Sequence, residues 1–119
     1  MSTFPFYKQP DYKDCGPTCL RIIAKHYGKL ISIQEIRKLS ETTRSGSNLL
    51  KLSDGAEAIG FKTIGARLDF KKLEQAQLSL IVHWNNNHFV VVYRIYKGRV
   101  YLSDPGYGLI FHKVGRYLD

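Results

Sequence analysis

Apolar residues recur every three or four positions through the first half of the chain, which is the spacing of helices with one buried face. A first helix should begin around Cys15-Gly16-Pro17, because a proline in the first helical turn lacks only an N–H that would have no partner there. Gly28 is a stop signal for this helix. Its apolar positions are Cys19, Leu20, Ile23, Ala24 and Tyr27. We therefore expect Cys19 to face the core and Cys15 to point out of the helix start.

Two more helices are predicted before residue 60. Ser32 and Glu35 have the spacing of a capping box and would start a short second helix over 33–39. After the polar loop 40–46, Ser47 is expected to cap a third helix that ends at Gly60. The core positions of these two helices are Ile33, Ile36, Leu39, Leu49, Leu52, Ala56 and Ile59.

The hydrophobic period changes to that of strands after residue 60. Residues 61–68 alternate between apolar and polar, as a half-buried strand does, and Asp69 can cap a brief helix that runs to about residue 76. Branched and aromatic runs predict central strands over 78–84 and 88–96, with a turn at 85–87 between them. Lys97-Gly98 predicts a tight hairpin into 100–102. A turn over 104–108 then leads into a last strand at 109–114.

Helices followed by antiparallel strands define an α+β fold, in which the N-terminal helices pack on one face of a C-terminal sheet. A length of 119 residues allows one core, so we expect a single domain over 1–119. Apolar runs stay far below the roughly 20 residues of a membrane helix. Because the chain stops just after a strand, we expect the domain to be part of a longer protein.

The composition excludes few classes of binding partner. Eighteen Lys and Arg against ten Asp and Glu give a formal net charge of +8, which would suit nucleic acid, an anionic membrane surface or an acidic peptide. The basic residues are scattered and do not alternate with aromatic residues, so no nucleic-acid partner is expected. We also expect a monomer, because neither a long apolar edge strand nor a heptad pattern indicates an interface.

The two cysteines, Cys15 and Cys19, favour a reducing compartment, since the chain shows no secretory signal. Their spacing is not that of a dithiol oxidoreductase. Together with His26 they could share one helix face and bind a metal, but no second ligand cluster completes a tetrahedral set. We therefore expect no metal site.

Cys15 is the candidate nucleophile. The free N–H groups and partial positive charge of a helix start favour thiolate over thiol, and Gly16 keeps bulk away from the sulfur. The alternative is that Cys15 is a small buried apolar residue, as free cysteines commonly are. A nucleophile needs a base and a group that orients the base, so partners elsewhere in the chain decide between these readings.

His88 is the better candidate base. It opens a predicted strand after a turn, where its side chain can project toward a cleft, whereas His83 lies inside the preceding strand and His26 more than two turns along the first helix. Counting back from the Lys97-Gly98 hairpin brings Phe89 or Val90 near the level of the Asp104-Pro105 end, which makes His88 and Asp104 neighbours. The alternative for Asp104 is a turn-forming residue before proline.

An oxyanion needs two hydrogen-bond donors. The backbone N–H of Cys15 at the helix start is one candidate. The side-chain amide of Gln9, on the loop that leads into Cys15, is the other, unless Gln9 is an ordinary surface glutamine.

Three ordered motifs resemble the C39 family of cysteine peptidases: the stretch from Gln9 to Leu20 with Asp14-Cys15-Gly16-Pro17, the run His88-Phe89-Val90-Val91, and Asp104-Pro105 followed by Gly108. The resemblance covers nearly the whole chain. It implies a papain-like fold and a domain of a bacterial peptidase-containing ABC transporter that matures and exports bacteriocins and related peptides. In such domains Cys15 would be the nucleophile, His88 the general base and acid, Asp104 the residue that orients His88, and Gln9 the oxyanion donor. Asp14 belongs to the family pattern, and its expected role is to cap the helix.

The resemblance also implies the partners. The substrate would be a precursor peptide whose leader is cut after a Gly-Gly pair on the cytoplasmic face of the membrane, and transmembrane and ATPase domains of the same chain would export the cargo. The peptidase domain would need no cofactor, while the full-length transporter would use ATP. An alternative is a catalytically silent module of the same fold that only binds the leader.

Overall fold

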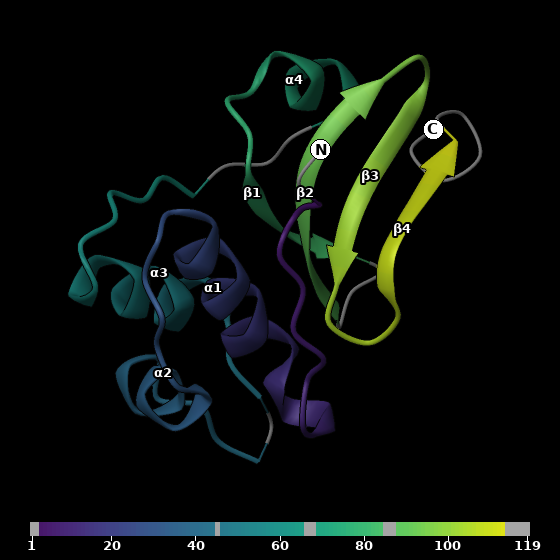
Figure 1. Cartoon of the computed structure of the whole chain (residues 1–119). Coiled ribbons are helices and arrows are strands. Elements are labelled where there is room, and N and C mark those ends of the chain that lie inside the picture. The colour runs from purple at the N-terminus through teal and green to yellow at the C-terminus, as the bar shows by residue number, and fades with distance from the viewer. Residues whose placement is uncertain (1–2, 45, 66–68, 85–87, 114–119) are drawn as a thin grey trace.

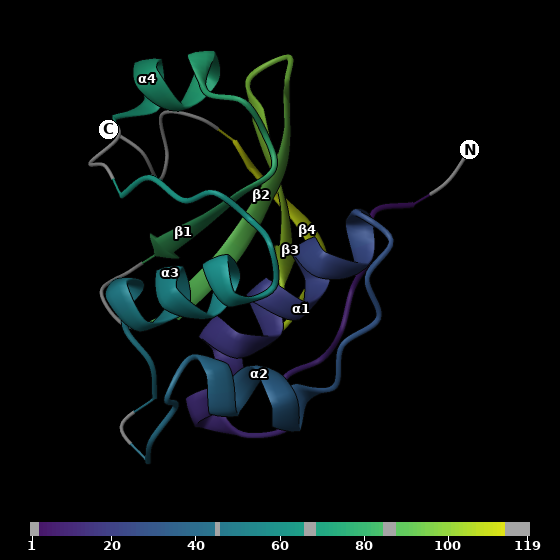
Figure 2. The same ribbon diagram turned by 90° about the vertical axis from the view of Figure 1, so that its left-hand side faces the viewer.

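The computed structural model describes residues 3–44, 46–65, 69–84 and 88–113. Three helices form the first half: α1 (Cys15–His26), α2 (Ile33–Leu39) and α3 (Leu49–Ala58). A short α4 (Phe70–Gln75) precedes four strands: β1 (Leu80–Trp84), β2 (His88–Tyr96), β3 (Arg99–Asp104) and β4 (Gly108–Lys113). Figures 1 and 2 show α1, α2 and α3 grouped beside the sheet. The predicted α+β organisation is confirmed.

The first helix begins at Cys15 itself, after a single 3₁₀ turn over Tyr12–Asp14. Gly28 follows the helix at a φ of +86°, a conformation that glycine adopts without strain. The prediction that Cys15 points out of the helix start is wrong, because only 7% of the residue is exposed. The first turn of α1 packs directly against β2, and Cys15 shares a buried cluster with Phe89 and Val91.

The second helix matches its prediction, since the Ser32 hydroxyl accepts a hydrogen bond from the Glu35 N–H at 3.2 Å. The third helix begins one residue later than expected. Asn48, not Ser47, is its cap and accepts from the Lys51 N–H at 2.9 Å. Ser47 instead donates its hydroxyl to the Ser40 carbonyl, which joins α3 to the end of α2.

The segment 61–65 is not a strand, which corrects the prediction of one over 61–68; residues 66–68 lie outside the described residues. Its polar side chains bond to a helix in place of a strand partner. The Thr63 hydroxyl pairs with Ser53 and donates to Glu57, both on α3. The helix α4 follows as predicted, with Asp69 accepting from the Lys72 N–H at 2.8 Å.

The sheet is antiparallel, with the order β1-β2-β3-β4. Tyr96 opposes Arg99 across the hairpin, as predicted, and a bulge between Val92 and Arg94 shifts the register so that Val91 opposes Ser103. The start of β2 and the end of β3 therefore lie at the same edge of the sheet. The predicted turn at 85–87 lies outside the described residues.

Both faces of the sheet are covered, but by different helices. Phe89 and Val91 pack with α1, whereas Val90 and Val92, which alternate with them, belong to a second cluster that includes Phe70 of α4. The helix α4 thus lies on the face opposite α1. The expectation that the helices pack on one face of the sheet therefore does not hold for α4. None of the described helices is both long enough and apolar enough to cross a membrane.

The segment before α1 runs along the sheet, as the purple ribbon of Figure 1 shows. Two hydrogen bonds attach it near the end of β3. The Gln9 N–H donates to the Pro105 carbonyl and the Ser103 hydroxyl donates to the Pro5 carbonyl, both at 2.9 Å. These bonds place Gln9 beside the edge at which β2 begins and β3 ends.

Candidate active site

His88 and Asp104 form a direct pair. The Nε2 atom of His88 lies 2.6 Å from Oδ1 of Asp104, from the first residue of β2 to the last residue of β3. Asp104 is buried, while the His88 side chain is 27% exposed. The same Asp104 oxygen accepts the Gly106 N–H at 2.9 Å. The sequence-based prediction that these two residues are neighbours is confirmed, and the bond leaves Nδ1 as the ring nitrogen that can face a thiol.

Gln9 lies against this pair. A Cβ atom built on Gly106 would be 3.5 Å from Asp104 Oδ1, 3.6 Å from His88 Cε1 and 3.7 Å from Gln9 Oε1, so Gly106 marks the point where the three side chains meet. Gly106 was not predicted as a site residue, although its place between Asp104 and Gly108 could have indicated it. A methyl group at this position would be in van der Waals contact with all three groups.

The Gln9 amide presents its oxygen to this point. Oε1 is buried and has no hydrogen-bond partner among the described residues, while Nε2 donates to the Asp11 carbonyl at 2.9 Å. An oxyanion requires a donor, so Gln9 could serve as one only after its amide turns over.

Cys15 reaches the same edge from the helical half. It opens α1, which packs against β2, and it shares a buried cluster with Phe89, the residue after His88. Gly16 allows this packing, because a Cβ atom there would lie 3.0 Å from the Leu52 side chain. Thus Gly16 admits a helix neighbour, a role different from the predicted one of leaving room at the sulfur.

Cys19 lies one turn along α1 and has no exposed surface. Burial raises the pKa of its thiol well above the usual value, and the nearby Cys15 and Asp104 act in the same direction. Cys19 is therefore a core residue, as predicted, and its burial favours the neutral thiol.

This raised pKa predicts a pH-dependent stability. The unfolded thiol ionises from about pH 8.5, while the folded one stays protonated. Above this pH the unfolded state binds fewer protons than the folded state. The contribution of Cys19 to the free energy of unfolding is therefore complete below about pH 8.5, and above it the free energy falls by up to about 1.4 kcal/mol per pH unit. Urea unfolding between pH 7 and 10 under reducing conditions should show this decline, and Cys19→Ala should flatten it. Equal slopes for the two proteins would contradict the assignment.

Asp14 does not cap α1, which corrects its predicted role: its side chain makes no capping hydrogen bond. The carboxylate is fully buried and accepts two bonds from Arg37, from Nε at 2.8 Å and from Nη2 at 2.5 Å. The side-chain hydrogen bond to Asp14 is the main cause that raises the pKa of Arg37. Arg37 was not predicted from the sequence, because it lies 22 positions after Cys15 and only the packing of α2 on α1 brings the two close.

The other histidines lie away from the pair. His83 is exposed on β1 opposite Phe89 and stacks on that ring at 4.5 Å, and His26 is exposed at the end of α1 against Phe4. His112 is half-buried in β4. Among the described residues no cluster of three His, Cys, Asp or Glu side chains could hold a metal ion.

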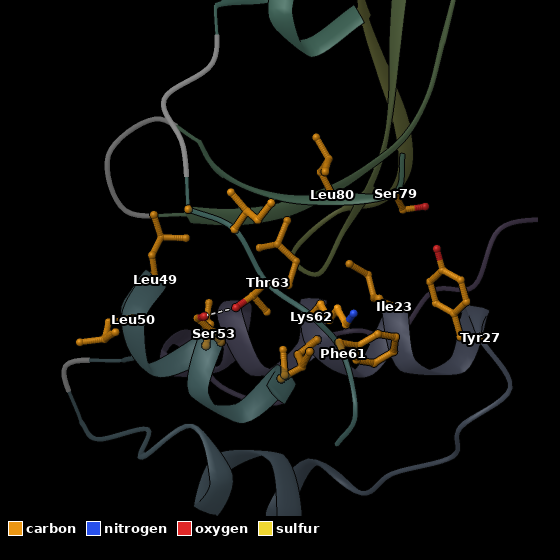
Figure 3. Close-up of a pocket in the computed structure, with 16 residues that line it drawn as sticks. Ile23, Tyr27, Leu49, Leu50, Ser53, Phe61, Lys62, Thr63, Ser79 and Leu80 are labelled. Atoms are coloured by element: carbon orange, nitrogen blue, oxygen red, sulfur yellow. Dashed lines mark hydrogen bonds between the residues drawn. The ribbon is translucent and has the colours of Figure 1, made fainter. Parts of the chain in front are cut away.

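An apolar groove of about 690 Å³ lies next to the first turn of α1. Figure 3 shows its walls: Ile23 comes from α1 and Tyr27 directly follows that helix, Leu49 and Leu50 come from α3, and Leu80 comes from β1. Leu52 lines the groove and also contacts Gly16, so the groove adjoins the first turn of α1. This groove could not be predicted from the sequence, because its walls combine helix faces expected in the core with the segment 61–65.

The thiol of Cys15 stands at a helix start and shares a buried cluster with Phe89, the residue after a histidine that is bonded to a carboxylate. A thiol at a helix start and a histidine paired with a carboxylate are the groups that a cysteine nucleophile requires. The fold agrees with solved peptidase domains. The peptidase domain of Streptococcus ComA, a bi-functional ABC transporter involved in a quorum-sensing pathway, is 27% identical and matches with a TM-score of 0.90, over 98% of this chain and 90% of that domain. A double glycine motif protease from an AMS/PCAT transporter, solved with the leader peptide, is 28% identical with a TM-score of 0.89, over 93% of this chain and 80% of its own. Fold and site together define a papain-like cysteine peptidase.

The model of the Peptidase C39 family matches residues 3–115, and the chain belongs to that family. A curated relative is the lactococcin-G-processing and transport ATP-binding protein LagD of Lactococcus lactis subsp. lactis, 31% identical over 115 residues. The match covers 92% of this chain but only 16% of that protein. The chain thus spans about one sixth of such relatives.

Proposed function

We propose that this domain cuts the leader from a precursor peptide after a Gly-Gly pair, with Cys15 as the nucleophile and His88 as its general base and acid. The observation that carries the proposal is the 2.6 Å contact between His88 Nε2 and Asp104 Oδ1 at the edge that α1 approaches with Cys15. The Gly-Gly specificity is supported by the likeness to a double glycine motif protease solved with a leader peptide.

The proposed reaction has two stages. His88 takes the thiol proton through Nδ1, the sulfur attacks the carbonyl carbon of the second glycine, and a C–S bond forms. The C–N bond then breaks as His88 protonates the leaving amine. Water attacks the thioester, His88 accepts its proton, and the leader leaves as a carboxylate while the thiol is restored.

Asp104 and Gln9 support these steps. The buried Asp104 carboxylate orients the imidazole and stabilises the imidazolium that forms after proton transfer. The Cys15 N–H and the Gln9 amide, once turned so that Nε2 faces the site, would donate to the oxyanion. This turn gives up the bond from Nε2 to the Asp11 carbonyl, so it requires the oxyanion to replace that carbonyl as the acceptor.

The apolar groove is the proposed site for the leader. Its rim exposes Leu49, Leu50 and Ile64, which is 94% exposed, and its floor reaches Leu52 beside Gly16. An amphipathic peptide that laid its apolar side chains here would place its next residues at the start of α1.

Ile64→Asp should raise KM for a leader-bearing substrate at least tenfold and leave kcat within twofold. Burying an isoleucine is worth about 1.5–3 kcal/mol, and a carboxylate in an apolar groove resists binding further. Steady-state kinetics on a leader peptide of increasing length measures the effect. Leu30→Asp is the matched control, because Leu30 is 80% exposed and lies outside the groove. A loss confined to kcat, or an equal loss for Leu30→Asp, would contradict this use of the groove.

The relatives suggest the setting of the domain. We propose that residues 1–119 are the peptidase part of an ABC exporter, that transmembrane and ATPase domains of the same protein carry the cargo, and that the domain works on the cytoplasmic face. The proposal is supported by the relatives, which are named as ATP-binding proteins of processing and of secretion or transport. ATP would serve the transport step, and the peptidase step needs only the side chains named above.

The test is incubation of the 119-residue domain with a synthetic peptide that joins an amphipathic leader ending in Gly-Gly to a short cargo, analysed by mass spectrometry. The expected product is a single cut after the second glycine, with the Cys15→Ala variant as the background and a Gly-Gly→Ala-Ala peptide left intact. Binding of the peptide without any cut would overturn the peptidase role in favour of a leader-holding module. A cut elsewhere would overturn the Gly-Gly specificity.

A further inference from the structure

The residue before the proposed nucleophile carries an unusual charge arrangement. Asp14 has no exposed surface, yet its carboxylate does not cap the helix that starts at Cys15. A buried carboxylate next to a thiolate opposes ionisation of the thiol by charge repulsion. A carboxylate in this position therefore needs a nearby positive charge that offsets its repulsion of the thiolate.

Arg37 supplies a charge of opposite sign in a fixed geometry. Its Nε and Nη2 atoms donate to the two oxygens of Asp14, at 2.8 and 2.5 Å, so the guanidinium grips the carboxylate as a fork. Such a fork fixes both position and orientation, which a single ammonium group does not.

The helix that carries Arg37 is itself well held. Ser32 caps α2, and Ile36 is fully buried in a cluster with Leu20 of α1 and Ala56 of α3. The guanidinium is therefore attached to a rigid support, and through Asp14 it restrains the backbone at which α1 begins. Position and charge at Cys15 depend on the same contact.

We propose that Arg37 is a positioning residue of the peptidase: it binds Asp14, sets the first turn of α1 that presents Cys15, and neutralises the negative charge beside the thiolate. The inference rests on the proposed role of Cys15. It gives α2 a part in the reaction, although this helix neither lines the groove nor contributes to the pair of His88 and Asp104.

The test compares Arg37→Gln, Arg37→Lys and the double variant Asp14→Asn/Arg37→Gln with Lys38→Gln, which removes the same charge from an exposed neighbour on α2. Kinetics on the Gly-Gly peptide are measured together with the rate of Cys15 alkylation by iodoacetamide at pH 7, read by mass spectrometry. The alkylation rate needs no substrate, so it tests Arg37 even where the choice of peptide is wrong.

Arg37→Gln should lower kcat at least tenfold, keep KM within twofold and slow alkylation by about the same factor as kcat. Arg37→Lys should retain most of the alkylation rate but lose about fivefold in kcat, because the charge remains while the fork is gone. The double variant should regain the alkylation rate to within threefold of the wild type, since no uncompensated carboxylate remains, and Lys38→Gln should match the wild type.

A kcat of Arg37→Gln equal to the wild-type value, or a loss confined to KM, would overturn the proposal. Circular dichroism at the assay temperature shows which variants are folded. Where Arg37→Gln does not fold, Arg37→Lys and the double variant decide the matter: a wild-type kcat in Arg37→Lys, or slow alkylation in the folded double variant, overturns it.

Discussion

Replacing Cys15 with alanine should reduce cleavage of a Gly-Gly leader peptide to background, a loss of at least about 10⁴-fold in kcat. The variant has no sulfur to attack the carbonyl, and removal of a nucleophile that acts as a unit with its base abolishes covalent catalysis. The groove does not contain Cys15, so the leader should bind with little change. Turnover by mass spectrometry and binding by calorimetry separate the two effects.

Cys19→Ala is the matched control for this prediction. It removes the same chemical group one helical turn away, from a residue with no exposed surface and a thiol whose pKa is raised by burial. Its kcat should stay within threefold of the wild type at pH 7. Comparable losses for the two variants would show that the substitutions act through the packing of α1, and residual activity in Cys15→Ala would exclude Cys15 as the nucleophile.

His88→Ala should lower kcat at least about 10³-fold at neutral pH. The imidazole would both generate the thiolate and protonate the leaving amine, and general acid–base catalysis of this kind contributes about 10² to 10⁴-fold per group. Alkylation of Cys15 by iodoacetamide should slow as well, because the thiol loses its proton acceptor. Both rates can be measured on the same preparation.

His83→Ala provides the comparison, because the two histidines lie on adjacent strands on either side of Phe89. His83 stacks on Phe89 and is exposed, and it has no contact with Asp104 among those observed. Its removal should change kcat less than threefold. If His83→Ala and His88→Ala lost activity equally, the base assignment would be wrong.

Local sequence was sufficient for most of the fold. Helix limits follow from caps and glycines, as Ser32, Gly28 and Gly60 show, because these signals act over one turn. The one-residue error at Ser47 arose because Asn48 is an equally good cap. The segment 61–65 was misjudged as a strand, since alternation alone does not reveal that Thr63 binds α3 in place of a strand partner.

The proximity of His88 to Asp104 could also be predicted, because a two-residue hairpin sets the approximate register between the antiparallel strands that carry them. Gln9 was placed near Cys15 by sequence proximity, but the direction of its amide could not be known. That direction depends on the Asp11 carbonyl and on a loop attached to Pro105, almost one hundred residues later.

By itself, then, the sequence determined the order and type of the helices and of the four strands, although not the form of the segment 61–65, and it supplied the motifs that carry the thiol, the imidazole and the carboxylate. Only the tertiary structure decided that Cys15 is buried, that α4 covers the opposite face of the sheet, that three elements enclose an apolar groove, and that Arg37 binds Asp14. The physical reason is range: caps, turns and hairpin register act between residues close in the chain, whereas burial, grooves and buried ion pairs depend on which helices pack together.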